Sequence, residues 1–453
     1  MEKLQEILEL INSWIWGKWL VFVLLGLGIL YTFTNNFVQV RYFGYIMKKT
    51  LIESFKNRNT DKGSGSIPTF KAMMVTLAGN VGGGNVVGVA TAIVAGGLGS
   101  VFWMWFAAFF GMALKYGEII LSQMYRGKDE EGNLLGGPMY YIRDGLHMPW
   151  LGVVIAVLMC VKMMGANLVQ SNTISNLLNS NYNIPTWITG VLLIVFLMII
   201  TLGGLKKLVN LVTALVPIMS IFYIITGILV IILNIQNVPT VISTIFTEAF
   251  SFKAIAGGTG GYVITRAFQN GITRGMYSNE AGEGTAPFAH GCSIVSHPVE
   301  EGITGVTEVF LDTMIICTIT ALVVGVTGIY QTDHSAAVMA VEAFGTFWKP
   351  LKHLGSFALL VFCFTTLIGQ WFNAAKSFTY AFGTKVTSVC RYIFPFLCII
   401  GALTKINFVW TLQDLAMGLV VIPNMIALLL LFPQVRTQTL DYFSKLNTKN
   451  ENS

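Results

Sequence analysis

The sequence predicts an all-α, polytopic membrane protein with eleven transmembrane helices. One N-terminal helix is expected to precede two inverted repeats of five helices, each with a broken first helix. The first observation is composition: of 453 residues, 54% are hydrophobic and only 11% are charged, whereas soluble domains carry roughly 25% charged residues. Too little charged surface exists to cover so large an apolar core, so lipid is the expected solvent.

The second observation is a series of long apolar runs. A spanning helix needs about 20 mostly apolar residues, and a barrel would need alternating strands that runs such as 191–200 exclude. The first run, 14–37, is too long for the apolar region of a signal peptide. The expected spans are 14–40, 68–97, 99–125, 149–178, 185–204, 209–234, 259–288, 299–328, 354–380, 387–403 and 409–432, with extracellular half-helices at 241–250 and 335–348.

The third observation is that Lys and Arg gather in alternate loops, as they do in cytoplasmic loops. The loops 179–185 and 234–251 carry almost none. This pattern predicts a cell-membrane protein with its N-terminus outside and its C-terminus in the cytoplasm, and it explains the net charge of +6 without nucleic-acid binding. The basic positions are Arg41, Lys48, Lys49, Lys56, Arg58, Lys62, Lys71, Arg126, Lys128, Arg143, Lys206, Lys207, Lys376, Lys385, Arg391, Arg436, Lys445 and Lys449.

Two glycine-rich segments open the two expected repeats. They lie at 77–89 (LAGNVGGGNVVGV) and 271–287 (GITRGMYSNEAGEGTAP). Interrupted segments at corresponding places in two halves are typical of a transporter binding site. The expected division is therefore 1–67 for the N-terminal helix and a basic linker, 68–234 for the first repeat, 235–433 for the second repeat with its half-helices, and 434–453 for a cytoplasmic tail.

The first glycine-rich segment is the leading candidate for a site. No charged residue occurs in 72–114, yet the segment holds Asn80, Asn85 and a run of glycines. Each glycine costs a helix roughly 1 kcal/mol relative to alanine, so the helix is expected to unwind here. Unwound carbonyls can bind a cation and N–H groups at a half-helix start can bind a carboxylate. The alternative is close helix packing through the GxxxG pairs Gly79–Gly83 and Gly84–Gly88.

Other polar and bulky residues are expected to complete that site. The adjacent hydroxyls of Thr365 and Thr366 would add cation ligands, although threonine often bonds its own helix. Asn167, Gln170, Ser171 and Asn172 form a polar cluster in the span 149–178. Phe268, Ile272 and Gly275 recur on one helix face, which is also the pattern of plain packing, and Phe268 and Trp371 would leave room only for a small ligand side chain.

The missing charge in 72–114 favours a ligand that is net neutral, such as a zwitterionic amino acid. Ionisable residues in other apolar runs are functional candidates because each costs roughly 2.5–3.5 kcal/mol at a helix centre. Lys162 and Arg274 are expected near helix ends, where long side chains reach water. Glu308 and Asp312, one turn apart, favour structural pairing or cytoplasmic gating over proton relay. The role of Arg266 stays open.

Enzyme chemistry finds little support in the sequence. The six cysteines fall mostly in apolar runs without metal-ligand spacing, and the histidines show no such spacing either. A dinucleotide or phosphate loop would need a soluble strand–turn–helix setting for its glycines. No cofactor is expected, and an intramembrane enzyme is the weakest of the alternatives.

Four stretches carry a resemblance to a known family: 77–91 (LAGNVGGGNVVGVAT), 136–142 (GGPMYYI), 272–291 (ITRGMYSNEAGEGTAPFAHG) and Trp371-Phe372-Asn373. With these, the chain resembles the alanine-or-glycine:cation symporter family over essentially its whole length. The resemblance implies the inverted-repeat fold of the bacterial leucine transporter and Na⁺-driven uptake, in some members H⁺-driven. By position it also implies that Gly79 and Val81 or Gly82 offer carbonyls to Na⁺, with Thr365 and Thr366 as the paired hydroxyls.

One departure matters: the two asparagines are one residue closer than in the leucine transporter, which puts a second Na⁺ site in doubt. The expected function is symport of Na⁺ with a small neutral amino acid, namely alanine, with glycine and D-alanine as further candidates; a channel is the alternative. The expected substrate-binding residues are Thr76, Gly79, Asn80, Gly83, Asn85, Asn167, Gln170, Phe268, Ile272, Gly275, Thr366 and Trp371, and the expected Na⁺ ligands are Gly79, Val81, Gly82, Thr365 and Thr366.

Overall fold

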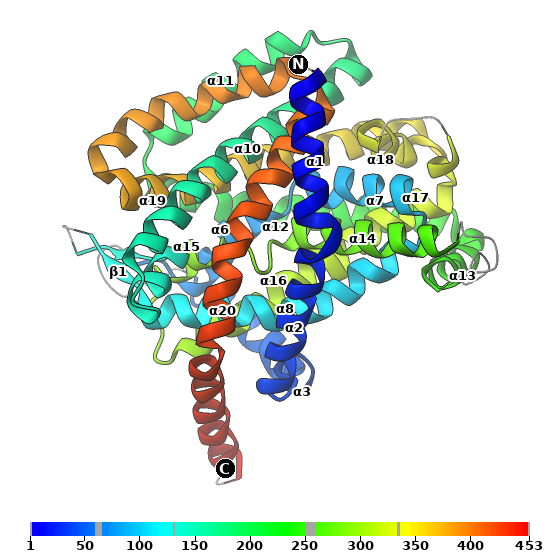
Figure 1. Cartoon of the computed structure of the whole chain (residues 1–453). Helices are drawn as coiled ribbons and strands as arrows, with labels where there is room; N and C mark the ends of the chain where they lie inside the picture. The colour runs from blue at the N-terminus through cyan, green and yellow to red at the C-terminus, as the bar shows by residue number, and fades with distance from the viewer. Residues whose placement is uncertain (1, 59–65, 130–131, 251–259, 333–335, 452–453) are drawn as a thin grey trace.

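The computed structural model describes residues 2–58, 66–129, 132–250, 260–332 and 336–451 (Figure 1). Lys62, the first residue of the expected half-helix 335–348 and the first residue of the expected span 259–288 lie outside these ranges. Within them the chain is almost entirely helical, as the apolar runs predict. Its strands are β1 (Gly127–Lys128) and β2 (Leu134–Leu135), a two-stranded antiparallel hairpin.

The first half of the chain contains α1 (Glu2–Lys18), α2 (Leu20–Thr34), α3 (Val38–Arg41), α4 (Phe43–Met47), the π-helical η1 (Lys48–Glu53), α5 (Ser54–Lys56), α6 (Thr69–Asn80), the π-helical η2 (Gly84–Gly88), α7 (Val89–Gly96), α8 (Gly99–Tyr125), α9 (Pro138–Tyr140), the π-helical η3 (Tyr141–Gly145), α10 (Pro149–Tyr182), α11 (Thr186–Leu202) and α12 (Leu205–Leu233).

The second half contains the 3₁₀ turn η4 (Ile235–Asn237), α13 (Val238–Ala249), α14 (Gly260–Asn279), α15 (Ala286–His290), α16 (Pro298–Val309), the π-helical η6 (Phe310–Cys317), α17 (Thr318–Thr327), the 3₁₀ turn η7 (Ile329–Gln331), α18 (Ala336–Gly345), α19 (Lys349–Leu403) and α20 (Ile406–Glu451).

Seven helices in the described residues are long and apolar enough to cross a membrane, or eight when the bent pair α6 and η2–α7 counts as one span. Helix occupies each of the eleven ranges expected from the sequence. α11 is apolar but short, and α14–α15 does not pass as a span, so the number of crossings stays a prediction. The single assignment α19 contains two expected spans, separated where Gly383 takes a φ of 86°.

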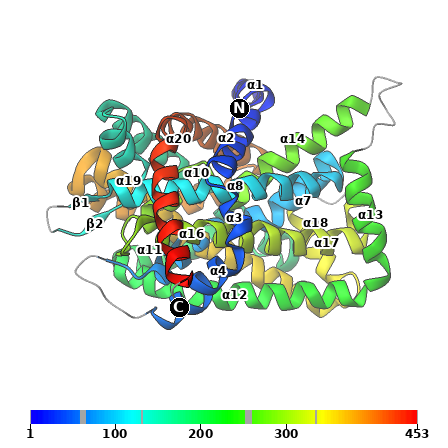
Figure 2. The same cartoon turned by 90° about the horizontal axis from the view of Figure 1, so that it is seen from below.

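The helices pack around the broken segment α6–η2–α7. α6 contacts α12 and α19, while α7 contacts α8 and α14. α10 lies against α19 and α20, and the N-terminal helices α1 and α2 lie along α20 (Figures 1 and 2). Because these neighbours surround it, every residue from Ala72 to Ala90 is buried. The break therefore lies in the interior of the bundle.

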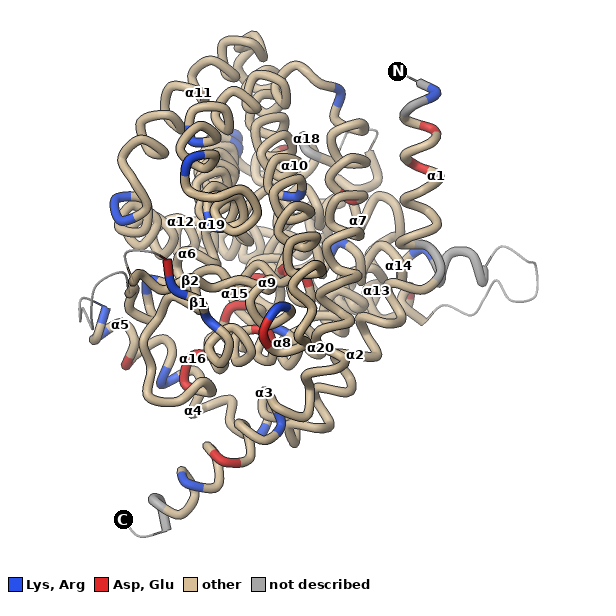
Figure 3. The backbone as a smooth tube through the Cα atoms, turned by 60° about the vertical axis from the view of Figure 1, so that its left-hand side comes forward, with Lys and Arg blue, Asp and Glu red and all other residues tan. Residues whose placement is uncertain are grey.

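Charged residues are sparse along the tube, and several lie in its interior beside α8 and α15 (Figure 3). Exposed side chains on the outer helices are largely apolar, among them Phe196, Ile199, Ile218 and Ile225. A large exposed apolar surface is what a lipid-facing protein needs and what a soluble monomer avoids. The distribution confirms the expectation of a multi-pass membrane protein.

Candidate functional site

The first broken helix unwinds at the glycines that predicted it. α6 ends at Asn80, Val81 is extended (φ −73°, ψ 96°), and the chain resumes at η2 with a bend of 53° between the two arms. Gly82 also permits a close approach, because a Cβ there would overlap Thr366 Oγ1 and lie 3.3 Å from Gln170 Oε1. The glycines open the helix, and Gly82 and Gly84 allow close approach by Thr366 and Tyr277. The GxxxG pairs as such do not pack closely, since a Cβ at Gly88 would meet nothing within 4 Å and one at Gly79 nothing nearer than 3.8 Å.

Two N–H groups of the unwound turn are bonded to side-chain oxygens. Gly82 N donates to Asn85 Oδ1 at 2.9 Å, and Gly83 N donates to Gln170 Oε1 at 3.1 Å. These bonds replace the helical partners that the break removes. A carboxylate could take the Gly83 N–H only by displacing Gln170, which makes Gln170 the movable member of this pair.

Two carbonyls of the turn face α19. Gly79 O accepts from Gln370 Nε2 at 3.1 Å, and Val81 O accepts from Thr366 Oγ1 at 3.2 Å. Thr366 therefore reaches the break. Both hydroxyls lie within reach of the Phe362 carbonyl of their own helix, at 2.9 Å for Thr365 and 3.0 Å for Thr366. Thr365 Oγ1 lies 3.2 Å from Met219 Sδ of α12 instead of a carbonyl of the break.

Asn85 braces the turn against the second half of the chain. Its Nδ2 donates to Ser278 Oγ at 2.8 Å and to Asp312 Oδ1 at 2.6 Å, and its carbonyl accepts from Thr320 Oγ1 at 2.8 Å. Ser278 Oγ also donates to Asp312 Oδ2 at 2.6 Å. Asp312 of η6 is thus hydrogen-bonded to Asn85 at the break and to Ser278 of α14, and it does not pair with Glu308.

The second broken helix lies beside the first. α14 ends at Asn279, and the chain then takes positive φ at Glu280 (54°), Gly282 (88°) and Gly284 (80°) before α15 begins. Asn80 Nδ2 donates to Asn279 O at 3.1 Å, and Gln370 Nε2 lies 3.2 Å from Glu280 Oε1. The two glycine-rich segments, far apart in sequence, therefore meet in one place.

Lys162 holds the second break through two carboxylates. Its Nζ lies 2.5 Å from Glu280 Oε1 and 3.1 Å from Glu283 Oε2, and its side chain is 1% exposed. On the far side of the same turn, Glu118 accepts from Gly284 N at 2.9 Å and from Asn424 Nδ2 at 2.6 Å. The expectation that Lys162 lies near a helix end and reaches water is wrong, because buried carboxylates hold it instead.

A second buried ionic group lies beside Asn279, the last residue of α14. Lys115 Nζ lies 3.2 Å from Glu308 Oε2 and donates to Asn279 O at 2.9 Å. His290 lies between two carboxylates, 2.6 Å from Glu308 and 2.7 Å from Glu301. Glu308 therefore has the structural pairing that the sequence favoured, with partners on α8 and α15.

The core around the break thus carries fixed charge, contrary to the expectation of an uncharged core. The stretch 72–114 holds none itself, but α8, α10 and the second break bring charges to it. Arg274, half-buried, forms a bidentate ion pair with Asp414 at 3.0 Å and lies over the Trp410 ring. Arg266 is exposed.

Several expected ligand-binding residues have other partners in this structure. Asn167 Nδ2 donates to Phe394 O at 3.1 Å, and Thr76 Oγ1 donates to Ala72 O at 3.1 Å within its own helix. Phe268 stacks on Phe22 and Trp103. Gly275 faces the backbone of Met104, which is the packing alternative for that helix face. Ile272 is fully buried.

The structure also assigns residues to the break that sequence reasoning missed. Gln370 contacts the first break directly and also contacts Glu280 of the second break. Ser278, Asn279 and Thr320 bond Asn80 or Asn85 of the first break and its flank. Two signals were available: Gln370 follows Thr366 by one helical turn, and Glu280 stands inside the second glycine-rich segment.

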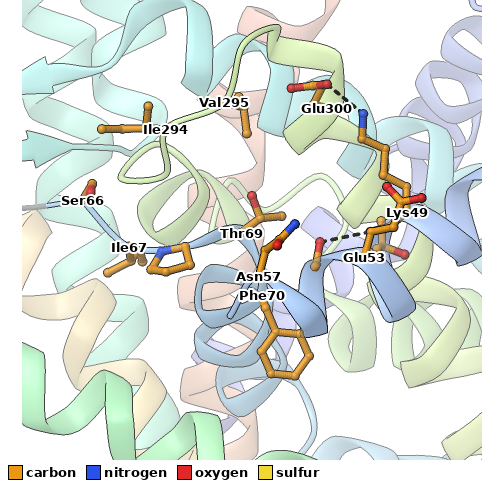
Figure 4. A pocket seen from close by; sticks show the side chains of 13 residues that line it. Lys49, Glu53, Asn57, Ser66, Ile67, Thr69, Phe70, Ile294, Val295 and Glu300 are labelled. Atoms are coloured by element: carbon orange, nitrogen blue, oxygen red, sulfur yellow. Dashed lines mark hydrogen bonds and ion pairs between the residues drawn. The ribbon is translucent and has the colours of Figure 1, made fainter. Parts of the chain in front are cut away.

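Two cavities lie away from the break. One, of about 260 Å³, is lined by Trp371 and by polar and basic residues that include Lys376, Thr387 and Arg391. The other, of about 310 Å³, adjoins the start of α6 and is lined by Lys49, Glu300 and Thr69 among others (Figure 4).

Lys49 Nζ lies 2.7 Å from Glu300 Oε1, and Thr69 Oγ1 donates to Glu301 Oε2 at 2.7 Å. Ile67 N also donates to Cys292 O at 3.1 Å, so the start of α6 is tied to the segment after α15.

Comparisons with known proteins agree on one family. Residues 1–453 match the model described as the sodium:alanine symporter family. The chain is 35% identical over 445 residues to the sodium/alanine symporter AgcS of Methanococcus maripaludis, with 96% of each chain covered. It is also 35% identical over 448 residues to the probable sodium/glutamine symporter GlnT of Bacillus subtilis, with 97% of this chain and 91% of that one covered.

A solved structure shows a related fold. A mutant of the manganese transporter of Eremococcus coleocola matches with a TM-score of 0.53 at 13% sequence identity, covering 82% of this chain and 78% of that one. At this identity the likeness concerns the fold alone.

Proposed function

Because the chain belongs to the sodium:alanine symporter family, we propose that it takes up alanine together with Na⁺ by alternating access. Membership makes the chain a multi-pass membrane transporter of a sodium-coupled amino-acid symporter family, and not an enzyme. The choice of alanine, with glycine and D-alanine as further substrates, belongs to the proposal. It is supported by the family's name and by the crowded surroundings of the first break.

One observation carries the proposal: the two broken helices meet, and a single α19 side chain touches both. Gln370 Nε2 bonds Gly79 O in the first break and Glu280 Oε1 in the second. A residue that joins the unwound turns of two helices can respond when either one moves. Broken helices that meet in the bundle interior are the arrangement by which transporters expose one site alternately to each side.

The proposed Na⁺ site lies between the unwound turn and α19. Val81 O and Thr366 Oγ1 are within 3.2 Å of each other and both carry oxygen lone pairs that a small cation prefers. Gly79 O, which accepts from Gln370 rather than from a helical N–H, and Gly82 O, which accepts from Asn85 N at 3.3 Å, would complete the set of carbonyls. Thr365, whose hydroxyl bonds its own helix, would have to change rotamer to join them.

The proposed substrate site adjoins the Na⁺ site at the same turn, at Gly79, Asn80, Gly83 and Gln170; a Cβ at Gly82 would lie close to both Thr366 and Gln170. The substrate carboxylate would take the Gly83 N–H in place of Gln170 Oε1, which now occupies it. Gly83 would leave room for that approach because it carries no side chain. Asn85 has every polar group of its side chain bonded within the protein, so we assign it to bracing rather than to ligand binding.

We further propose eleven crossings arranged as one helix plus two inverted repeats, in the cell membrane, with the N-terminus outside and the C-terminus in the cytoplasm. The eleven helical ranges and the alternate basic loops support this topology. In that orientation the start of α6 and the cavity in Figure 4 lie at the cytoplasmic side.

Uptake into liposomes tests the proposal. The purified full chain is reconstituted, and uptake of labelled alanine, glycine, D-alanine and glutamine is followed under an inward gradient of Na⁺, with K⁺ as the matched control. Accumulation of alanine above equilibrium under Na⁺ alone supports it. Equilibration without accumulation would indicate a channel, and preferential accumulation of glutamine would reassign the substrate.

A further inference from the structure

Several buried side-chain oxygens lack a hydrogen-bond donor where the two breaks meet. Among the described residues, Asn80 Oδ1, Gln370 Oε1 and Glu280 Oε2 receive no hydrogen bond. Their side chains are 5%, 1% and 5% exposed, respectively. A buried acceptor without a donor costs roughly 1–3 kcal/mol, and more when it is charged, so three of them together need an explanation.

Amide orientation does not explain them. Asn80 Nδ2 donates to the Asn279 carbonyl and Gln370 Nε2 donates to the Gly79 carbonyl. Both partners are acceptors only, so exchanging the amide oxygen and nitrogen would place two acceptors against each other. The amide oxygens must therefore point away from those carbonyls. Gln370 also donates to Glu280, and Asn80 bonds the backbone of Asn279, the residue before Glu280.

The charges around Glu280 also favour a positively charged group at these oxygens. Lys162 is shared by Glu280 and Glu283, so this group of two carboxylates and one ammonium carries a surplus negative charge when all three are ionised. The next buried ammonium, Lys115, is paired with Glu308. Buried charge needs a compensating partner. The carboxylate oxygens of this group that receive no hydrogen bond are Glu280 Oε2 and both oxygens of Glu283, and of these two residues it is Glu280 that Gln370 contacts.

Glu280 is also held in an unusual backbone conformation. It has a φ of 54°, where residues with a side chain are uncommon. Strain of this kind costs about 1–3 kcal/mol and gathers at functional sites. In this conformation one carboxylate oxygen, Glu280 Oε1, accepts from both Lys162 Nζ and Gln370 Nε2, while Oε2 receives no hydrogen bond.

We propose that Asn80 Oδ1, Gln370 Oε1 and Glu280 Oε2 accept the ammonium group of the transported amino acid, with Glu280 as the residue that makes the site specific for an amino acid over an uncharged analogue. This rests on the proposed function and adds the acceptor for the positive end of the substrate. An ammonium has three N–H donors, enough for one hydrogen bond to each of these three oxygens. A bound Na⁺ would offer the same positive charge, and the experiment separates the two.

The test measures binding of labelled alanine to the purified full chain in nanodiscs at saturating Na⁺, with L-lactate as competitor. Lactate has the methyl and carboxylate of alanine but a neutral hydroxyl in place of the ammonium. In Glu280→Gln, alanine affinity is expected to fall about 30-fold, which corresponds to losing one charge-assisted hydrogen bond. Lactate affinity is expected to change by less than about threefold, on the order of an uncharged contact.

The matched control is Glu283→Gln, which removes the same charge from the same lysine but has no hydrogen bond to Gln370. Its alanine affinity is expected to fall by less than about threefold, on the order of a screened charge effect. An equal loss in both variants would overturn the proposal, since net charge rather than the Glu280 oxygen would then matter. Unchanged alanine affinity in Glu280→Gln would overturn it as well.

A second measurement distinguishes the ammonium from Na⁺. Thermal stabilisation by Na⁺ without amino acid is expected to have the same midpoint in wild type and Glu280→Gln. The proposal would be overturned if Glu280→Gln needed a tenfold higher Na⁺ concentration for half of the thermal stabilisation but kept its alanine affinity at saturating Na⁺. That result would assign the oxygens to Na⁺. If Glu280→Gln does not fold, Gln370→Met removes another of the three oxygens, and the same preferential loss of alanine over lactate is expected. Failure of wild type to bind any amino acid would instead defeat the proposed function.

Discussion

Thr366 Oγ1 lies 3.2 Å from the carbonyl oxygen of Val81, joining α19 to the unwound turn of the first broken helix. If this pair binds Na⁺, Thr366→Val removes one ligand while keeping the shape of the side chain. The Na⁺ concentration for half-maximal alanine uptake should rise about tenfold or more, because a hydrogen-bond or ligand contact to a charge is worth roughly 1.5–3 kcal/mol. Uptake in proteoliposomes over a Na⁺ series measures it.

Thr365→Val is the matched control for that change. Its hydroxyl bonds carbonyls of its own helix, so the variant should keep a Na⁺ dependence within about twofold of wild type, on the order of a satisfied local hydrogen bond. A large rise for Thr365→Val with none for Thr366→Val would exchange their roles and refute the placement drawn from this structure.

The contrast between these threonines shows what the sequence could and could not predict. Apolar run length placed helices in all eleven expected ranges, because insertion into lipid depends on local composition. The glycine run predicted the break, because the cost of glycine in a helix is local too. Which of two adjacent hydroxyls faces the break depends on the rotation of α19 against α6, and that is fixed by tertiary packing.

The buried ion pairs could not be predicted from the sequence for a related reason. Lys162 and Glu280 are 118 residues apart, and neither the hydropathy nor the spacing of their segments indicates that they meet. Local sequence suggested that Lys162 would reach water at a helix end. Lys162 is buried because the second break packs against α10 and brings Glu280 and Glu283 to it. That contact depends on the tertiary structure.

Asn85 should act on stability more than on affinity. Asn85→Ala removes the hydrogen bonds to Gly82, Ser278 and Asp312 and leaves the Gly82 N–H and Asp312 Oδ1 unmatched, while Ser278 keeps its bond to Asp312 Oδ2. Since each unmatched buried group costs about 1–3 kcal/mol, the melting temperature of the detergent-solubilised protein should fall by several degrees. Alanine affinity of the folded fraction at low temperature should stay within about threefold of wild type, on the order of an indirect effect.

A double-mutant cycle of Asn85→Ala with Asp312→Asn checks the mechanism. If the two residues stabilise the break together, the double variant should be less destabilised than the two single variants combined, by roughly 0.5–3 kcal/mol. Strict additivity would show that Asn85 acts independently of Asp312. A large loss of affinity without a loss of stability would return Asn85 to the ligand-binding residues.

Trp371 is expected to limit the size of the substrate side chain. It follows Gln370, which contacts the first break, and it packs against Phe394 with ring centroids 5.2 Å apart. It also lines the cavity of about 260 Å³ that lies away from the break. Trp371→Ala opens space next to the helix turn that carries Gln370. The ratio of glutamine to alanine uptake should rise about tenfold, on the scale of discrimination that a hydrophobic wall provides.

Phe372→Ala is the corresponding control, since it truncates a buried aromatic residue of the same helix that does not line this cavity. Its glutamine-to-alanine ratio should match that of wild type even if total uptake falls. An unchanged ratio in Trp371→Ala would remove Trp371 from the residues that set substrate size.

The start of α6 offers a test of movement at the proposed cytoplasmic side. Lys49 Nζ lies 2.7 Å from Glu300 Oε1 and also contacts the Tyr45 and Tyr442 hydroxyls. Burial lowers the pKa of Lys49, but the hydrogen bonds to Glu300, Tyr442 and Tyr45 outweigh it and raise that pKa above its ordinary value. Lys49 therefore stays charged, and its loss should weaken the attachment of η1 to α16 beside the cavity in Figure 4.

Cys292 reports whether that attachment restrains opening, because its thiol is buried and its carbonyl accepts from Ile67 N. In Lys49→Met the rate of Cys292 alkylation, followed by peptide mass spectrometry, should rise about two- to fivefold, which matches the 0.2–1 kcal/mol of a partly exposed ion pair. Lys445→Met breaks an exposed pair with Asp441 and should leave the rate unchanged. Equal rates in wild type and Lys49→Met would show that the ion pair does not restrain α6, leaving the Thr69–Glu301 hydrogen bond and the Ile67–Cys292 pairing as the contacts that open.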